Sequence, residues 1–212
     1  MKFELSCEQY SRLYPAALQI DEKSAIANRD FMRSIRLEHK NGKSLMVATC
    51  GSILACECLG ETDEPDCAIN LKLDEKLRRQ CVAEIQFDSK LHITFDLASG
   101  WIAAQTTLGY SHTANLNTGF DWEFENIDDW RQIVAVGTKP RKSSGAIAVE
   151  ADWLIRLTET SPSKSIVFPE RFDTQQALII TDLNDPNWFG LFLANKRAQK
   201  SSSATQLNWF EA

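Results

Sequence analysis

Cysteine, histidine and the acids perform most side-chain chemistry in proteins, and this chain holds six cysteines and three histidines. No two cysteines have the C-x-x-C spacing that zinc sites and redox motifs use. Cys56 and Cys58 would share one face of a strand, so they could hold a metal only with ligands from elsewhere in the fold. The thiols are therefore predicted to be reduced and to pack as small apolar groups. They are Cys7, Cys50, Cys56, Cys58, Cys67 and Cys81.

The sequence contains no recognisable catalytic motif. His39, His92 and His112 are dispersed along the chain. There is no glycine-rich phosphate loop, no G-x-S-x-G turn and no H-E-x-x-H helix. The paired acids in "IDDW" (127–130) are more typical of a helix cap than of a metal site. We therefore predict no catalytic residues, no metal and no cofactor, and expect that the protein is not an enzyme.

The composition is that of a soluble globular protein. The chain has 212 residues, 43% of them hydrophobic and 25% charged, which is enough for one large domain or two small ones. Its net charge of −6 means that any contact with nucleic acid must come from a local basic face. Six tryptophans and eleven phenylalanines could stack on single strands, but most occupy strand positions that face the expected core.

We expect a cytoplasmic protein that does not contact membranes. The sequence has no run of eighteen apolar residues, which is the length needed to cross a bilayer. Its first ten residues, "MKFELSCEQY", lack the apolar core of a signal peptide.

The first part of the chain predicts a strand, a helix and then several antiparallel strands. "KFELS" reads as the strand, and Ser6 with Gln9 predicts a capping box that starts the helix. Pro15 should kink or break that helix because it lacks an amide proton. Asn41-Gly42 predicts a hairpin turn, and the strands "SLMVATC" and "ILACECL" follow it.

A second group of elements follows the acidic loop "ETDEPD". "CAINLKL" reads as a strand, and "DEKLRRQ" as a short helix with acids first and bases last. Residues 82–95 predict a hairpin with Asp88-Ser89 at the turn, and "GWIAAQT" predicts another strand. Residues 109–121 read as a connection. The apolar side chains of the predicted hairpin that share one face are Ile85, Phe87, Leu91, Ile93 and Phe95.

The same order of elements then returns. After the short helix "IDDWRQIVAV" and the basic loop "GTKPRKSSG" come a strand ("AIAVE"), a helix ("ADWLIRLTETS") and three strands ("SIVF", "QALIITDL", "NWFGLFLA"). This repetition predicts an α+β fold of two similar domains, with sheets that carry helices on one face. The expected boundaries are 1–107 for the first domain, 108–119 for a connection, 120–195 for an abridged second domain, and 196–212 for a flexible tail.

Three stretches resemble the bacterial sliding clamps, the beta subunit of the chromosomal replicative polymerase. The strand-hairpin-strand run 28–55 ends in "ATCGSILA", where the family normally has A-T-D-G-H-R-L-A. "DWRQIVA" is similar to a segment near a domain junction, and "ALIITDLNDPNWFGLFLANK" to the closing hairpin of the family. The resemblance implies the sliding-clamp (DNA clamp) fold and a shortened member of the kind found on mobile elements. Two domains per chain would resemble the trimeric clamps of archaea, eukaryotes and some phages.

The departures from the family concern DNA contact. Cys50, Ser52 and Ile53 replace the Asp, His and Arg of the signature, and Ile53 removes a phosphate donor. A ring around DNA also needs basic inner helices, but the first helix offers only Arg12, offset by Glu8. The candidate DNA-facing bases come from "DEKLRRQ" and "TKPRK", where solvated helix ends and loops are an equal interpretation. They are Lys76, Arg78, Arg79, Lys139, Arg141 and Lys142.

The tail resembles the short motif with which polymerases and repair proteins dock on bacterial clamps. Gln206, Leu207, Asn208, Trp209 and Phe210 follow the serine-rich linker "AQKSSSAT". The three apolar side chains could fill a groove while the glutamine binds backbone groups at its edge. The alternative is that the tail packs on the protein's own body.

Two hypotheses follow. The first is a non-enzymatic, clamp-like replication protein that acts as a processivity factor, with double-stranded DNA, a DNA polymerase and further copies of itself as partners. The second is an adaptor or competitor that docks on a resident bacterial clamp through residues 206–210 without encircling DNA.

Overall fold

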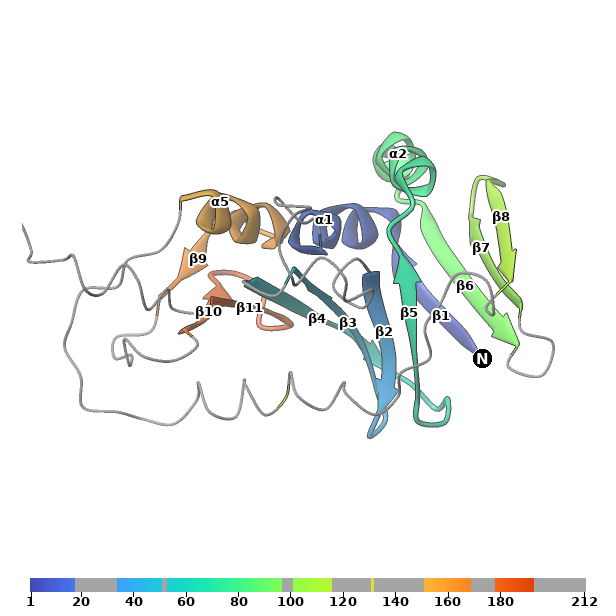
Figure 1. Cartoon of the computed structure of the whole chain (residues 1–212), viewed down its shortest axis with the longest axis horizontal. Coiled ribbons are helices and arrows are strands. Elements are labelled where there is room, and N and C mark those ends of the chain that lie inside the picture. Colours follow the sequence, from blue (N-terminus) through green and yellow to red (C-terminus); the bar gives the residue numbers. More distant parts are fainter. Residues whose placement is uncertain are drawn as a thin grey trace, which may run out of the picture.

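A computed structural model describes residues 1–17, 34–50, 53–96, 101–115, 131, 151–168 and 178–192. These residues form an α+β fold in which three helices lie on one side of the sheets (Figure 1). The sheets and helices enclose one main core, to which β1, α1, β6 and α5 all contribute fully buried apolar side chains. The predicted fold class is therefore confirmed. The elements, in chain order, are β1 (Lys2–Ser6), α1 (Cys7–Ala17), β2 (Ser34–Lys40), β3 (Lys43–Thr49), β4 (Ile53–Glu61), β5 (Cys67–Lys72), α2 (Glu75–Glu84), the 3-10 helix η3 (Ile85–Phe87), β6 (Lys90–Asp96), β7 (Trp101–Thr106), β8 (Ser111–Asn115), α5 (Ala151–Thr160), β9 (Ile166–Val167), β10 (Leu178–Asp182) and β11 (Trp188–Phe192).

The strands form two antiparallel sheets. The smaller sheet has the order β1-β6-β7-β8, and the larger has the order β5-β2-β3-β4-β11-β10-β9. The larger sheet joins distant parts of the sequence, because β4 pairs with β11 from Ile53↔Phe192 to Glu57↔Trp188. Helices α5, α1 and α2 lie in that order along the sheets (Figure 1), and α1 packs against both of its neighbours.

Local sequence signals explain where the first elements begin and turn. The predicted capping box is present: the Gln9 amide donates to Ser6 Oγ at 3.0 Å, and the Ser6 amide donates to Gln9 Oε1 at 2.8 Å. The predicted β2–β3 turn is also confirmed, with Asn41 at φ 54° and Gly42 at φ 73°. Positive φ at both central residues is what a tight hairpin requires.

Helix α1 does not break at Pro15. It continues to Ala17, so the break, which was one of the two predicted outcomes, does not occur. Eight of the eleven residues of this helix are buried, and the helix packs against α2, α5 and the sheets. We attribute its continuation to this packing, which outweighs the cost of a proline in a helix interior, about 3 kcal/mol.

The predicted hairpin over residues 82–95 is also wrong in its first half. Residues 82–84 extend α2, and Ile85–Phe87 form η3, which leaves the Phe87 side chain exposed. The helix continues because Leu77, Cys81 and Glu84 form its buried stripe. Asp88 then reverses the chain at φ 52° before β6 begins. Only the β6 half of the predicted apolar face (Leu91, Ile93 and Phe95) lies in a strand.

The segment predicted as a connection contains a strand. Ser111–Asn115 form β8 and pair with β7. Its composition, "SHTAN", has no apolar alternation, and its place at the edge of the smaller sheet explains why none is needed.

Candidate nucleic-acid interface

Helix α2 positions the three described residues of the predicted DNA-contacting set. Asp74 caps the helix, since its side chain accepts hydrogen bonds from the amides of Lys76 (2.8 Å) and Leu77 (3.3 Å). The buried Leu77 and Cys81 fix which side of α2 faces the core. Lys76 and Arg79 are therefore exposed, and Arg78 is half-buried.

Glu75 reduces the positive charge that α2 presents. Its carboxylate accepts hydrogen bonds from Arg78 Nε at 2.8 Å and from Arg79 Nε at 3.1 Å. These bonds lower the pKa of Glu75 to about 2, so the carboxylate stays charged at neutral pH. The Arg78 guanidinium also lies over the Tyr14 ring, 5.3 Å from its centroid. Arg78 is thus fixed in place, whereas Lys76 forms no ion pair within the described part of the chain.

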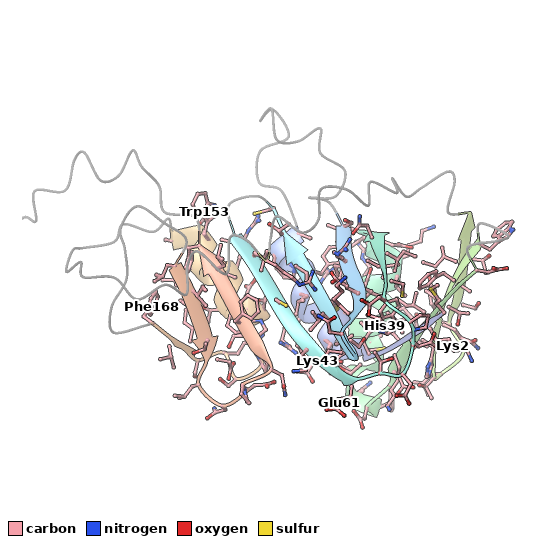
Figure 2. All side chains as sticks on the ribbon, turned by 90° about the horizontal axis from the view of Figure 1, so that it is seen from below. Lys2, His39, Lys43, Glu61, Trp153 and Phe168 are labelled. Carbon is pink, nitrogen blue, oxygen red and sulfur yellow. The ribbon has the colours of Figure 1, made fainter. Side chains whose placement is uncertain are left out.

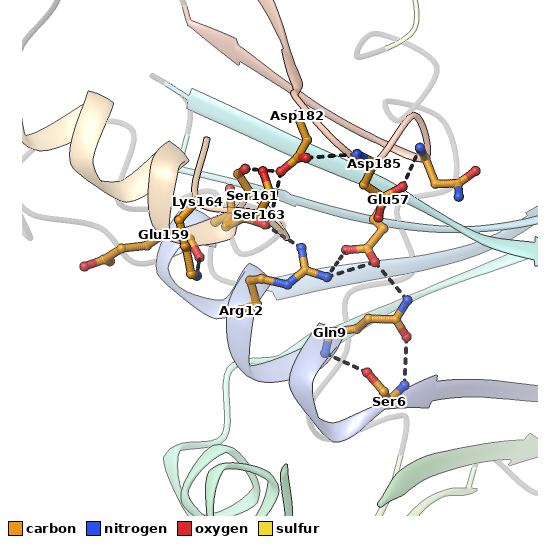
Figure 3. Close-up of polar contacts among 12 residues, drawn as sticks. Ser6, Gln9, Arg12, Glu57, Glu159, Ser161, Ser163, Lys164, Asp182 and Asp185 are labelled. Atoms are coloured by element: carbon orange, nitrogen blue, oxygen red, sulfur yellow. Dashed lines mark hydrogen bonds and ion pairs between the residues drawn. The ribbon is translucent and has the colours of Figure 1, made fainter. Parts of the chain in front are cut away.

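The rest of the helical layer does not add a basic surface. Arg12 of α1 is buried, and its Nη2 donates to both oxygens of Glu57 at 2.8 and 2.9 Å (Figure 3). Its Nη1 donates to the carbonyl of Thr160, the last residue of α5, at 2.6 Å. The Arg12 guanidinium therefore joins α1 to β4 and α5 and cannot reach a phosphate.

The exposed charged side chains of α1 and α5 are acidic. Glu8 on α1 and both Asp152 and Glu159 on α5 are exposed. A duplex that approached this face would meet cations at α2 and carboxylates at α5. The basic side chains that are exposed on the described helices therefore lie on α2.

Residues 48–55, which resemble the clamp signature, include side chains that pack in the core. The Ile53 side chain is buried in the core on the helix side of β4, and Thr49 Oγ1 donates to the Ile53 carbonyl at 2.7 Å. The remaining candidates, Lys139, Arg141 and Lys142, lie outside the described residues, as does the tail motif 206–210.

A second apolar cluster, which was not predicted from the sequence, lies on the face of the larger sheet opposite the helices. Val47, Leu54, Cys56 and Leu191 are buried there, and Ile179 and Phe189 are half-buried beside them. The signal was present, because "LMVA" and "ILAC" are continuous apolar runs, which indicate strands that are covered on both faces. On the same face, Glu38 pairs with Arg36 at 2.9 Å and with Arg131.

The described residues contain neither a disulfide nor a metal-ligand cluster. All six cysteines are free thiols, and burial raises the pKa of Cys7 and of Cys67. No cluster of His, Cys, Asp and Glu in these ranges could hold a metal ion. Within the same ranges, no helix has the length and apolar character to cross a bilayer.

The fold is similar to that of bacterial sliding clamps. No family model matches the sequence, and no curated protein matches it. A solved DNA polymerase sliding clamp from Pseudomonas aeruginosa superposes with a TM-score of 0.58 at 13% identity, over 92% of this chain and 66% of that chain. The DNA polymerase III beta subunit of Thermotoga maritima gives 0.60 at 12% identity, with 92% and 65% covered. The beta subunit of Borrelia burgdorferi gives 0.61 at 11% identity, with 92% and 62% covered.

The chain therefore has the sliding-clamp fold and spans about two thirds of the length of these clamps. At 11–13% identity the similarity concerns the fold alone.

Proposed function

We propose that this protein is a clamp-like replication factor of the cytoplasm that binds double-stranded DNA, associates with a DNA polymerase and catalyses no reaction itself. The observation that carries the proposal is the sliding-clamp fold over 92% of the chain, with three helices side by side on one face. Lys76 and Arg79 give that face its exposed cations on α2. Lys139, Arg141 and Lys142 are proposed to add to them.

The charge distribution also sets the expected strength of binding. Each phosphate that a cation neutralises adds about 0.9 to the slope of log K against log salt concentration. Because Arg78 and Arg79 both contact Glu75 and acids lie on α5, we expect weak binding that is lost at moderate salt. A protein with this surface would stay on DNA through its topology rather than its affinity.

Fluorescence anisotropy with a short duplex at several salt concentrations tests this assignment. We expect Lys76→Ala to weaken binding several-fold and to lower the salt slope by about one. Lys43→Ala, which removes an exposed lysine on the β2–β3 hairpin, is the matched control and should leave both unchanged. Equal effects of the two variants, or no binding of DNA at low salt, would contradict the proposal.

A second candidate function rests on the tail sequence. Gln206–Phe210 has the composition of a peptide that inserts apolar side chains into a groove, and we propose that it docks on a resident bacterial clamp as an adaptor or competitor. The half-buried Ile179 and Phe189 on the outer face of the larger sheet are an apolar alternative seat within this chain.

Truncation after Ala204 separates this candidate from the first. Under the adaptor hypothesis the full chain captures a purified bacterial clamp and the truncated chain does not. A Trp209→Ala/Phe210→Ala variant of the full chain should behave like the truncation, whereas Ser202→Ala in the linker should not. Capture that persists after truncation would exclude the tail as the docking element.

A further inference from the structure

Four large apolar side chains are exposed at the end of the molecule where α5, β9 and β10 lie (Figure 1). Their exposed fractions run from 40% to 64%. Figure 2 shows Phe168, one of the four, far from Lys2 of β1. We name this group the α5–β10 patch, which consists of Ile155, Val167, Phe168 and Leu183.

The backbone beneath the patch is hydrogen-bonded. The Leu183 amide donates to the Ser165 carbonyl at 2.8 Å, and β9 pairs with β10. The Phe168 ring stacks on the buried Phe192, with the ring centroids 6.4 Å apart. Loose packing therefore does not explain the exposure, and a segment that covers the patch would find its side chains already in place.

The patch extends over both faces of a sheet edge. Strand β9 is the last strand of the larger sheet, and β10 is its one strand partner in the described part of the chain. Phe168 lies on the helix side, since it stacks on Phe192 of the main core. Val167 is opposite Thr181, an exposed residue that alternates with buried neighbours in β10 and so lies on the other face. A strand added at this edge would cover both Phe168 and Val167.

The tail has the apolar pattern that such a strand needs. In an extended backbone, Leu207 and Trp209 point to one side and Phe210 to the other. Both faces of the edge would thus receive an apolar side chain from the same short segment.

The tail also starts next to the patch. Residues 193–205 separate the motif from Phe192, the last residue of β11, on which Phe168 stacks. A serine-rich linker of this length is expected to span about 20 Å on average. Tethering by a short linker gives an effective concentration in the millimolar range. The motif can therefore reach the patch without any rearrangement of the described fold.

Charge favours the same contact. The exposed Asp152 and Glu159 are three and four residues from Ile155, so all three lie on one side of α5. The linker 193–205 carries three bases and no acid, and opposite charges steer the two segments together. Helix α2, at the other end of the molecule, exposes bases instead and would repel the linker. The bases of the linker are Lys196, Arg197 and Lys200.

We propose that residues 206–210 dock on the α5–β10 patch of their own chain, as an added strand beside β9. The other seat within the chain, on the outer face of the larger sheet, offers less exposed apolar surface because Ile179 and Phe189 are half-buried. While the tail is docked, its apolar side chains cannot fill a groove on another protein. The contact therefore holds the tail back from a partner, and it does not depend on the proposed clamp-like function.

A fluorescent peptide of residues 200–212 tests whether the patch is already occupied. Anisotropy measures the binding of this peptide to the full wild-type chain and to Trp209→Ala/Phe210→Ala, which releases the tail. We expect wild type to bind the peptide about tenfold more weakly than the released variant, or weaker still, because the tethered tail competes at its effective concentration. Ser202→Ala in the linker is the matched control and should behave like wild type.

A second pair of substitutions locates the seat. In the released variant, Val167→Asp/Leu183→Asp should abolish peptide binding. Phe87→Asp/Leu108→Asp, which alters exposed apolar side chains near α2 and β7 at the other end of the molecule, should not. Circular dichroism and urea unfolding establish that each variant is folded. If Val167→Asp/Leu183→Asp does not fold, Leu183→Ser replaces it, changes one side chain that is 64% exposed, and should weaken binding several-fold.

Three results would overturn the inference: no binding of the peptide to the released variant, equal binding to the wild type and the released variant, or binding that survives substitution of the patch. Capture of a purified bacterial clamp by the same proteins is measured in parallel. Peptide docking without clamp capture refutes the adaptor hypothesis alone, and clamp capture without peptide docking refutes the docked tail alone.

Discussion

The buried ion pair between Arg12 and Glu57 gives a sharp prediction about what holds α1, β4 and α5 together. Both side chains are almost fully buried, with 6% and 4% of their surfaces exposed. Glu57 accepts two bonds from Arg12 and one from Gln9 Nε2, at 2.8 to 2.9 Å. Arg12 reaches onward to α5 through the Thr160 carbonyl. The pair therefore connects α1, β4 and α5, as Figure 3 shows.

Glu57→Gln removes the negative charge with almost no change in volume. The Arg12 cation would then remain buried without a counter-ion, which destabilises proteins by about 3–5 kcal/mol. For a chain of this length, each kcal/mol lowers Tm by about 2–4 °C. Glu4→Gln is the matched control, since Glu4 pairs with Lys90 at the surface and such pairs contribute about 0–1 kcal/mol.

Urea unfolding of both variants measures this difference, and hydrogen exchange locates it. We expect Glu57→Gln to lower the free energy of unfolding several times more than Glu4→Gln and to speed exchange in α5. The double variant Arg12→Met/Glu57→Leu should recover part of the loss, because it removes both charges together. Equal losses for Glu57→Gln and Glu4→Gln, with unchanged exchange in α5, would refute the role of the pair.

Two further predictions concern the C-terminal strands. Burial would raise the pKa of Asp182, but the bonds that it accepts from Ser161 Oγ and the amides of Ser163 and Asn184 outweigh burial and hold the pKa well below its usual range. Its contribution to stability is thus fully present above about pH 4, the unfolded pKa, and is lost as the pH falls toward the folded pKa. Urea unfolding from pH 7 to pH 2 should show Asp182→Asn less stable than wild type at pH 7 and the gap narrowing below about pH 4; a constant gap would contradict this. At Gly190, an added Cβ would lie 2.8 Å from Trp188 Cη2 and 3.0 Å from Leu157 Cδ2. Gly190→Ala should therefore lower the free energy of unfolding by about 1–3 kcal/mol through overpacking, and a Tm equal to that of wild type would show that the core adjusts without loss.

Features set by neighbouring residues could be predicted from the sequence. The Ser6–Gln9 capping box and the Asn41-Gly42 turn each depend on at most four consecutive residues, and both are present. The repeated order of strand, helix and strands was sufficient to predict the α+β class. The cap and the turn depend only on adjacent residues, so tertiary packing seldom overrides them.

The errors lie where distant residues decide the structure. Ile85 and Phe87 alternate as strand residues do, but buried Glu84 joins the end of α2 to Ser89 and Thr106 and so favours the helix. Arg12 was interpreted as a weak contributor to a DNA face because its partner Glu57 is 45 positions away. The contacts of Arg78 and Arg79 with Glu75, by contrast, were predictable from their spacing of three and four residues.

The most direct test of the account is the retention of the protein on closed circular DNA before and after a single cut. The described helices expose few cations, so we expect binding to a short duplex to be lost at moderate salt. At that salt concentration the protein should remain on the closed circle, and it should be released when the circle is cut. Equal retention on the closed and the cut DNA, or none on either, would contradict it.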